Sequence, residues 1–132
     1  MRLLLDTHIA LWFAIEPGRL TDAENHLLTA ENEIAVSAVS LWELRLKWDA
    51  FYRSGERKGP ADPRTVLAAL TRLDLRLIDL DPAQAATSLV HSLPHKDPFD
   101  ELLVVQAQEL DMMLLTRDAR LIGHPLALPS IA

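Results

Sequence analysis

Short apolar runs alternate with longer, partly polar segments along this chain. Three runs of consecutive apolar residues, at 3–5, 34–36 and 112–115, each end at a polar residue. Brief, wholly apolar runs are typical of strands buried on both faces of a parallel sheet. Residues 75–80 alternate between apolar and polar and predict another strand, and residues 126–128 predict a small edge strand.

The segments between these runs carry the start and stop signals of helices. Thr21 and Glu24 have the spacing of a capping box, which predicts a helix that begins there. Asp81 followed by Pro82 marks another helix start, and Asp97 followed by Pro98 leads into a third. We predict helices at residues 7–15, 21–31, 38–48, 63–73, 82–92, 102–110 and 118–122.

Strands that alternate with helices predict an α/β fold, in which a parallel sheet carries helices on both faces. The chain of 132 residues is long enough for one domain, residues 1–132, with its own core. The one clearly loop-like stretch, residues 53–63, contains two glycines and two prolines. It is too short to link two domains.

Composition excludes several classes of protein. Hydrophobic residues make up 49% of the chain, which argues against intrinsic disorder. The absence of cysteine rules out disulfides and thiolate metal sites. The first apolar run is too short for the core of a signal peptide, and no run approaches the roughly 18 residues of a membrane span. We therefore expect a cytoplasmic protein that does not enter a membrane.

Charge is distributed unevenly along the chain. The net charge is −6, but residues 45–64 hold six basic and three acidic residues, which leaves −9 for the remainder. A solvated surface would explain this local excess of +3. A basic rim that attracts nucleic acid to a neighbouring acidic site would explain it equally well. The basic residues are Arg45, Lys47, Arg53, Arg57, Lys58 and Arg64.

Acidic residues stand at the ends of the predicted elements. Asp6 and Asp118 follow the first and the fourth strand, where ligands bind in open α/β sheets. Each also suits the N-cap of a helix. Asp97 and Asp100 would stabilise a helix start in the same way. Glu43 lies inside a predicted helix, where an ordinary ion pair with a lysine four residues later would explain it.

Taken together, these acids point to a metal site. Carboxylates gathered at one edge of a sheet resist ionisation unless a cation neutralises them. A site built from oxygen ligands, without cysteine, suits a hard cation such as Mg²⁺ or Mn²⁺. Such a cation activates water and stabilises the leaving oxygen in phosphodiester hydrolysis.

Four blocks of the sequence also stand out together: Leu4-Leu5-Asp6-Thr7-His8, Val36-Ser37-Ala38-Val39-Ser40-Leu41-Trp42-Glu43-Leu44, Lys96-Asp97-Pro98-Phe99-Asp100-Glu101-Leu102-Leu103 and Leu114-Leu115-Thr116-Arg117-Asp118. In this order they resemble the signature blocks of PIN-domain ribonucleases, most closely the VapC-type toxin branch. The resemblance spans practically the whole chain. It implies a three-layer α/β/α sandwich with a small, mostly parallel sheet of four to five strands. It also implies an endoribonuclease that depends on Mg²⁺ or Mn²⁺, forms a homodimer and is silenced by a cognate antitoxin.

The resemblance assigns roles to particular residues. Asp6, Glu43, Asp100 and Asp118 resemble the four acids of the family. Thr116 resembles the polar residue of the family's Thr-x-Asp motif. The choice between Asp97 and Asp100 as the third acid stays open. Secondary candidates at the site are Thr7 and His8, and His95 also lies near a proposed acid in the sequence. Candidate RNA contacts are Arg45, Lys47, Arg57, Lys58, Lys96 and Arg117, with Arg120 as a further possibility.

Two other classes of function remain open. An aspartate-nucleophile phosphatase or a phospho-acceptor domain would also place Asp6 near Mg²⁺. The phosphatase would need a second acid two residues later, where this chain has His8, and the phospho-acceptor domain a lysine after a late strand, but no lysine follows Lys96. The other class is a PIN-like fold that serves only as an interaction module.

Overall fold

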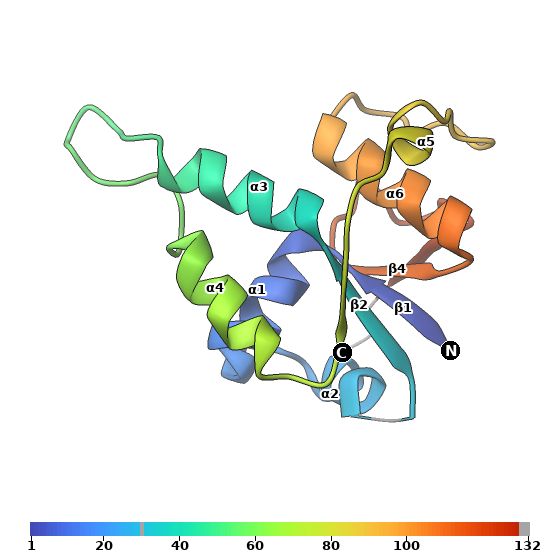
Figure 1. The fold of residues 1–132 in the computed structure, drawn as a ribbon, viewed down its shortest axis with the longest axis horizontal. Helices are drawn as coiled ribbons and strands as arrows, with labels where there is room; N and C mark the ends of the chain where they lie inside the picture. The colour runs from blue at the N-terminus through green and yellow to red at the C-terminus, as the bar shows by residue number, and fades with distance from the viewer. Residues whose placement is uncertain (30, 130–132) are drawn as a thin grey trace.

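The computed structural model describes residues 1–29 and 31–129, and its centre is a parallel sheet of five strands (Figure 1). The strands follow the order β3-β2-β1-β4-β5, and every neighbouring pair is parallel. Two central pairings fix the register, because Leu4 lies opposite Ala35 on one side and Leu114 on the other. The strands are β1 (Arg2–Leu5), β2 (Glu33–Ser37), β3 (Arg76–Ile78), β4 (Met113–Thr116) and β5 (Ala127–Pro129).

Helices connect these strands, and several begin at the caps that the sequence predicts. Thr21 and Glu24 form a capping box at α2, because each side chain accepts the other residue's backbone N–H. Asp81 and Gln84 form a second capping box at α5. The helices are α1 (Thr7–Ile15), η1 (Pro17–Arg19, a 3-10 helix), α2 (Asp22–Thr29), α3 (Ala38–Trp48), α4 (Pro63–Thr71), α5 (Pro82–Ala85) and α6 (Pro98–Leu110).

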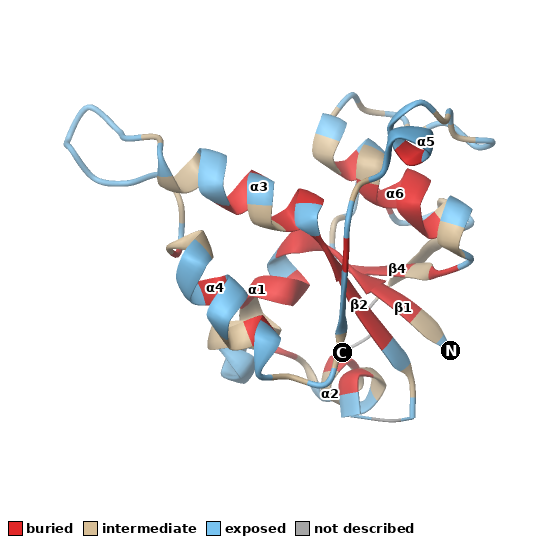
Figure 2. Ribbon diagram, viewed as in Figure 1, coloured by how far each residue is buried: buried red, intermediate tan, exposed pale blue. Residues whose placement is uncertain are grey.

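The sheet separates two apolar clusters, as alternation along the central strand requires. Leu3 and Leu5 face a cluster that includes side chains of α1, α2 and α4. Leu4 faces the opposite cluster, which is dominated by α6. Buried residues accordingly run through the sheet and along the inner sides of these helices (Figure 2). The predicted three-layer α/β/α sandwich with a parallel sheet is confirmed.

Three predicted helices are wrong in extent or in kind. The helix predicted at 82–92 ends at Ala85, because backbone groups of Ser88 and Val90 hydrogen bond to the Gln108 side chain of α6 instead. The helix predicted at 118–122 is a series of turns that reverses the chain into β5. The helix predicted from residue 102 begins earlier, at Pro98, with Asp97 as its cap.

Other boundaries differ by less. The strand predicted at 75–80 is limited to β3, and the helix predicted at 63–73 ends at Thr71. For the helix predicted at 21–31, α2 ends at Thr29, and residue 30 lies outside the described residues. No helix among the described residues is long and apolar enough to cross a membrane.

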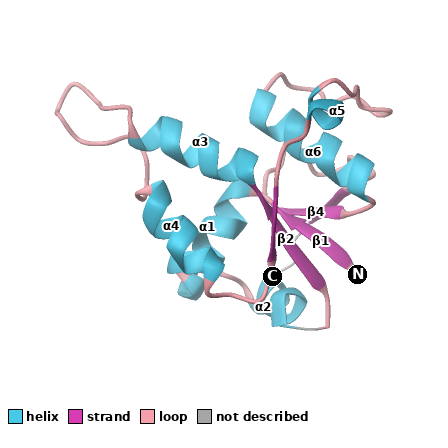
Figure 3. Ribbon diagram, in the orientation of Figure 1, coloured by secondary structure: helices cyan, strands magenta, loops and turns pink. Residues whose placement is uncertain are grey.

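The loop between α3 and α4 extends away from the rest of the molecule (Figure 3). We call residues 49–62 the arm. Its chain doubles back through a single antiparallel bridge between Phe51 and Arg57, and Gly55 takes a positive φ of 90° at the tip. At its base, a side chain on Gly59 would collide with the backbone of Trp48. The arm is therefore a closed hairpin held against the last turn of α3.

Candidate active site

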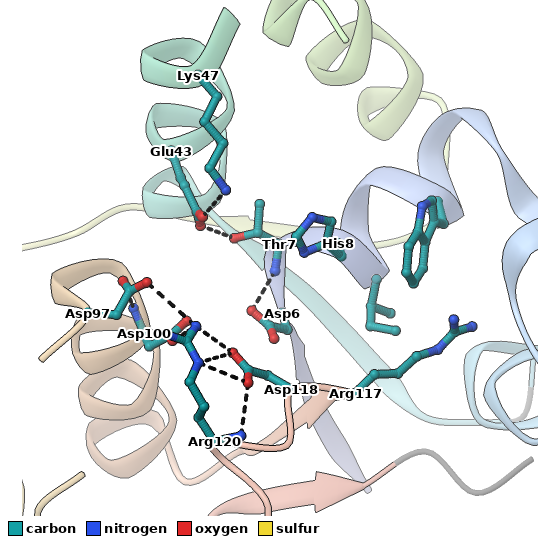
Figure 4. Close-up of a pocket in the computed structure, with 12 residues that line it drawn as sticks. Asp6, Thr7, His8, Glu43, Lys47, Asp97, Asp100, Arg117, Asp118 and Arg120 are labelled. Atoms are coloured by element: carbon teal, nitrogen blue, oxygen red, sulfur yellow. Dashed lines mark hydrogen bonds and ion pairs between the residues drawn. The ribbon is translucent and has the colours of Figure 1, made fainter. Parts of the chain in front are cut away.

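The strand order reverses between β1 and β4, so the carboxyl ends of these two strands flank the switch point of the sheet. Asp6 directly follows β1, and Thr116 is the last residue of β4. The helices α3 and α6 bring Glu43 and Asp100 toward the same edge (Figure 4). Four separate segments thus supply one site.

A pocket with a volume of about 320 Å³ occupies this edge. It contains all four acids that the sequence singled out, together with Asp97, Thr7 and His8. Of the candidate RNA contacts, Lys47, Arg117 and Arg120 line it, whereas Arg45, Arg57, Lys58 and Lys96 lie outside it. The lining residues are Asp6, Thr7, His8, Ile9, Trp12, Glu43, Lys47, Asp97, Asp100, Arg117, Asp118 and Arg120.

Asp6 serves as a helix cap and as a pocket carboxylate at the same time. Its Oδ1 accepts the Thr7 N–H at 2.8 Å, which caps α1. Its Oδ2 accepts the Thr116 hydroxyl at 2.6 Å. Burial raises the pKa of Asp6 above its ordinary value, although both hydrogen bonds oppose this shift. The site therefore holds a carboxylate whose charge the protein solvates incompletely.

Thr116 links the two acids of the central strands. Its hydroxyl donates to Asp6 and accepts the backbone N–H of Asp118 at 2.9 Å. A hydroxyl can do both, because it has one donor and two lone pairs. The spacing Thr-x-Asp therefore has a geometric reason, since it lets one side chain bind the Asp6 carboxylate and the backbone of Asp118.

Glu43 is buried, unlike the surface glutamate that its helical position alone would suggest. Thr7 donates its hydroxyl to Oε1 at 2.7 Å, and Lys47 donates to Oε2 at 2.8 Å. The ion pair expected at i, i+4 is thus present, but it lies at the pocket. Glu43 is held in place from both sides.

Asp97 and Asp100 have different environments. Asp97 caps α6, because its Oδ1 accepts the N–H groups of Phe99 and Asp100 at 2.9 and 3.1 Å. Asp100 is 6% exposed, and its Oδ2 lies 2.8 Å from Nε2 of His95. Burial raises the pKa of Asp100, and the neighbouring acids add to this effect. These environments favour Asp100 as the third acid, with Asp97 as the cap that starts its helix.

Asp118 is neutralised from within the chain. Arg120 Nη2 lies 2.9 Å from Asp118 Oδ2 and 3.3 Å from Asp100 Oδ2. Hydrogen bonding to this guanidinium lowers the pKa of Asp118 below its ordinary value. From the sequence, Arg120 is only a further candidate among the basic residues, because its i, i+2 spacing from Asp118 does not reveal a partner on α6.

Comparison with known proteins identifies the family. A family model of the PIN domain matches residues 3–124, which is most of the chain. The chain belongs to the PIN-domain family. Ribonuclease VapC22 of Mycobacterium tuberculosis (strain ATCC 25618 / H37Rv) is 38% identical over 125 residues, covering 92% of this chain and 90% of that protein. This PIN domain is therefore of the VapC type, as its four sequence blocks suggested.

Solved structures share the fold of this PIN domain. A toxin-antitoxin complex from Klebsiella pneumoniae contains a chain that superposes with a TM-score of 0.63, at 20% identity and 98% coverage of both chains. VapBC2 from Rickettsia felis, bound to a DNA fragment from its promoter, gives 0.59 at 18% identity, with 98% of this chain and 97% of that chain covered. At such identities the likeness concerns the fold alone.

Arg117 of the PIN domain supports the site from its far side. Its Nε donates to Glu24 Oε2 at 2.6 Å, and its Nη2 donates to Glu24 Oε1 and to the backbone oxygen of Arg19. The guanidinium carbon lies 4.5 Å from the Trp12 ring centroid. Glu24 is fully buried in α2. The sequence identified Glu24 only as part of a capping box, and nothing local indicates that its carboxylate also binds Arg117.

Two histidines lie near the acids. His8 is exposed at the pocket and tilts against Trp12, with ring centroids 5.7 Å apart. His95 contacts Asp100 through Nε2, whereas its buried Nδ1 has no hydrogen-bond partner in the described part of the chain. The structure thus gives His95 a contact that can orient Asp100.

The side chains fit a divalent cation in kind, although not in their present arrangement. Within residues 1–29 and 31–129, no three acidic or histidine side chains are close enough together to hold a metal ion. Protein groups hold the carboxylates instead, including Arg120 at Asp118 and Lys47 at Glu43. The donor set consists of carboxylate oxygens, which Mg²⁺ and Mn²⁺ prefer. Cation binding would require some of these internal contacts to open.

Proposed function

We propose that this PIN domain is a metal-dependent endoribonuclease, the toxin of a toxin–antitoxin pair, which hydrolyses RNA phosphodiester bonds at the pocket formed by Asp6, Glu43, Asp100 and Asp118. One observation carries the proposal: four acids from four separate segments converge on one pocket at the switch point of the sheet. The likeness to a relative named as a ribonuclease supports the reaction.

Asp6, Asp100 and Asp118, with Glu43, would hold Mg²⁺ or Mn²⁺. When bound there, such a cation would supply an activated water and would stabilise the leaving oxygen. The chain itself positions these ligands. Thr116 orients Asp6 and Asp118, Thr7 and Lys47 hold Glu43, and His95 holds Asp100.

RNA would approach across the basic side of the site. Lys47 lies at the pocket, and α3 continues from it into the arm, which carries Arg57 and Lys58. Exposed Arg45 and Lys96 would add charge outside the pocket. Arg117 also lines the pocket, but its guanidinium is bound to Glu24, so we assign it a supporting role.

We further propose a cytoplasmic homodimer that binds a cognate antitoxin. The chain from Klebsiella pneumoniae that shares this fold comes from a toxin-antitoxin complex, which supports a protein partner of this kind. The phosphatase alternative has less support, because His8, and not a second acid, stands two residues after Asp6 at the pocket. The phospho-acceptor alternative has less support because no lysine follows Lys96 in the chain. A non-catalytic interaction module does not account for four converging acids.

Cleavage of a mixed cellular RNA pool tests the proposal. Purified protein should cut RNA with Mn²⁺ or Mg²⁺ and not with EDTA. Asp6→Asn should reduce cleavage by about 100-fold or more, because it removes a ligand charge next to the reacting phosphate. Asp74→Asn, an exposed substitution just before β3, is the matched control and should leave cleavage unchanged.

The mutant also separates the protein's own activity from contamination. Cleavage that persists equally in Asp6→Asn comes from another nuclease. A folded, antitoxin-free protein that cuts none of the RNAs with either metal ion would contradict the proposal and favour the interaction module.

A further inference from the structure

Arg120 stands among the acids of the pocket (Figure 4). Its Nη2 lies 2.9 Å from Asp118 Oδ2, 3.3 Å from Asp100 Oδ2 and 3.9 Å from Asp97 Oδ2. Its Nε also lies 3.2 Å from Asp118 Oδ1. One guanidinium therefore bridges the loop after β4 and the first turn of α6.

The acids that Arg120 bridges are two of those that a divalent cation would need. Asp100 is almost fully buried and lies near three other acids whose charges disfavour its own. Among the ion pairs of the described residues, those of Arg120 are the ones that join Asp118 to Asp100. A divalent cation and the Arg120 guanidinium would compete for the oxygens of these two carboxylates. Each needs the same lone pairs, and the two positive charges repel each other.

Arg120 can also leave this position. Its side chain is 56% exposed. It lines a second pocket of about 210 Å³ formed with His91, Gly123 and His124. Arg117, three residues earlier, differs because it is fixed by buried Glu24 and by a backbone carbonyl. The Arg117 side chain is 35% exposed, so Arg120 is the more accessible of the two arginines at the site.

We propose that Arg120 is an exchangeable counter-ion: it neutralises Asp100 and Asp118 while no divalent cation is bound, and it turns to an RNA phosphate when the cation takes these carboxylates. The inference rests on the proposed function. A guanidinium that loses a carboxylate partner finds its best replacement in a phosphate, which offers the same paired oxygens. The guanidinium that neutralises these carboxylates is then used to bind substrate.

Metal titration tests the first half of the proposal without any RNA. Calorimetric titration of metal-free protein with Mn²⁺ should give a dissociation constant about 3- to 10-fold lower for Arg120→Gln than for the wild type, because the competing charge is gone. Arg120→Lys keeps a charge and should stay near the wild type. Arg64→Gln removes an exposed arginine paired with Asp62 outside the pocket and should leave the Mn²⁺ dissociation constant unchanged.

Turnover at saturating Mn²⁺ tests the second half. Arg120→Gln should cut RNA about 10-fold or more slowly, because it lacks a charged donor for the phosphate. Arg120→Lys should recover part of this loss. A damaged fold would weaken metal binding and slow turnover. Tighter metal binding together with slower turnover therefore separates the proposed role from loss of structure.

Each departure from this pair of results is decisive. Unchanged or weaker Mn²⁺ binding by Arg120→Gln would overturn the proposal, because Arg120 would not compete with the cation. Tighter binding with undiminished turnover would also overturn it, because Arg120 would then be a competitor only. A wild-type protein that binds Mn²⁺ but cuts no RNA would contradict the proposed function, while the titration would still decide the competition.

Discussion

Arg117 and Arg120 lie in one short loop, but their surroundings give them different roles. Arg117 points away from the acids toward Glu24, which is 0% exposed, and toward the face of Trp12. It thereby joins the loop after β4 to α2. Arg120 points into the pocket and contacts Asp118 and Asp100. The direction of each side chain, and not its charge, separates support from binding.

Removing Arg117 should destabilise the fold. Arg117→Ala removes the guanidinium that pairs with the buried Glu24 carboxylate, so we expect a loss of about 2–4 kcal/mol in the free energy of unfolding. Urea denaturation measures it. The same substitution in a Glu24→Gln background should lower the free energy of unfolding by less, because the buried side chain is then uncharged. Arg19→Ala breaks only the exposed pair with Glu16 and should cost under about 0.5 kcal/mol. Equal effects of Arg19→Ala and Arg117→Ala would contradict this account.

At the scale of elements, the arm is mostly exposed, with every residue from Phe51 to Lys58 on the surface. Phe51 and Tyr52 are 52% and 56% exposed, and each ring makes a cation–π contact with a basic side chain of the arm. The Arg57 guanidinium carbon lies 4.3 Å from the Trp48 ring centroid and 4.7 Å from that of Phe51, and Lys58 Nζ lies 5.4 Å from that of Tyr52. Flat rings interleaved with positive charge suit the bases and phosphates of single-stranded RNA.

The arm should therefore contribute to RNA affinity. In the Asp6→Asn background, Phe51→Ala with Tyr52→Ala should weaken binding of a single-stranded RNA by about 10-fold, measured by fluorescence anisotropy. Lys58→Ala should reduce the slope of log affinity against log salt by about 0.7. Val90→Ala, which truncates an exposed apolar residue away from the arm, is the control. Unaltered RNA affinity in the double variant would exclude the arm from RNA binding.

At the scale of the whole molecule, the acidic balance has a consequence for partners. The chain carries −6 overall, while residues 45–64 carry +3. A bound RNA would therefore be attracted to the side that carries residues 45–64 and repelled by the rest of the surface. A partner that covers the basic side or the pocket would block cleavage, and that is the effect expected of an antitoxin.

Oligomeric state and inhibition test the proposed partners. Light scattering after size-exclusion chromatography should give the mass of two chains for the protein alone. The purified antitoxin should form a larger, stable complex with it, and that complex should not cut RNA under the conditions that support cleavage by the free protein. A monomer at all concentrations would contradict the homodimer. Full cleavage by the complex would contradict inhibition.

Local sequence patterns determined most of the elements and which residues reach the sheet edge. The apolar runs predict three strands, β1, β2 and β4, because strands buried on both faces need uninterrupted apolar side chains. The same pattern predicts Asp6 and Asp118 at the sheet edge, since Asp6 directly follows one run and Asp118 comes two residues after Thr116, the residue that ends another. The caps at Thr21 and Asp81 depend on contacts within one turn, so the sequence alone reveals them.

Only the tertiary structure decided contacts between distant segments. The helix predicted at 82–92 stops early because Gln108, far along the chain, binds its backbone. The turn at 118–122 follows from the need to place β5 beside β4. Arg117 pairs with Glu24, and Arg120 pairs with Asp100, although the partners are far apart in the sequence and no local pattern predicts these pairs. Propensity and capping act over a few residues, whereas burial and charge pairing depend on which elements the fold brings together.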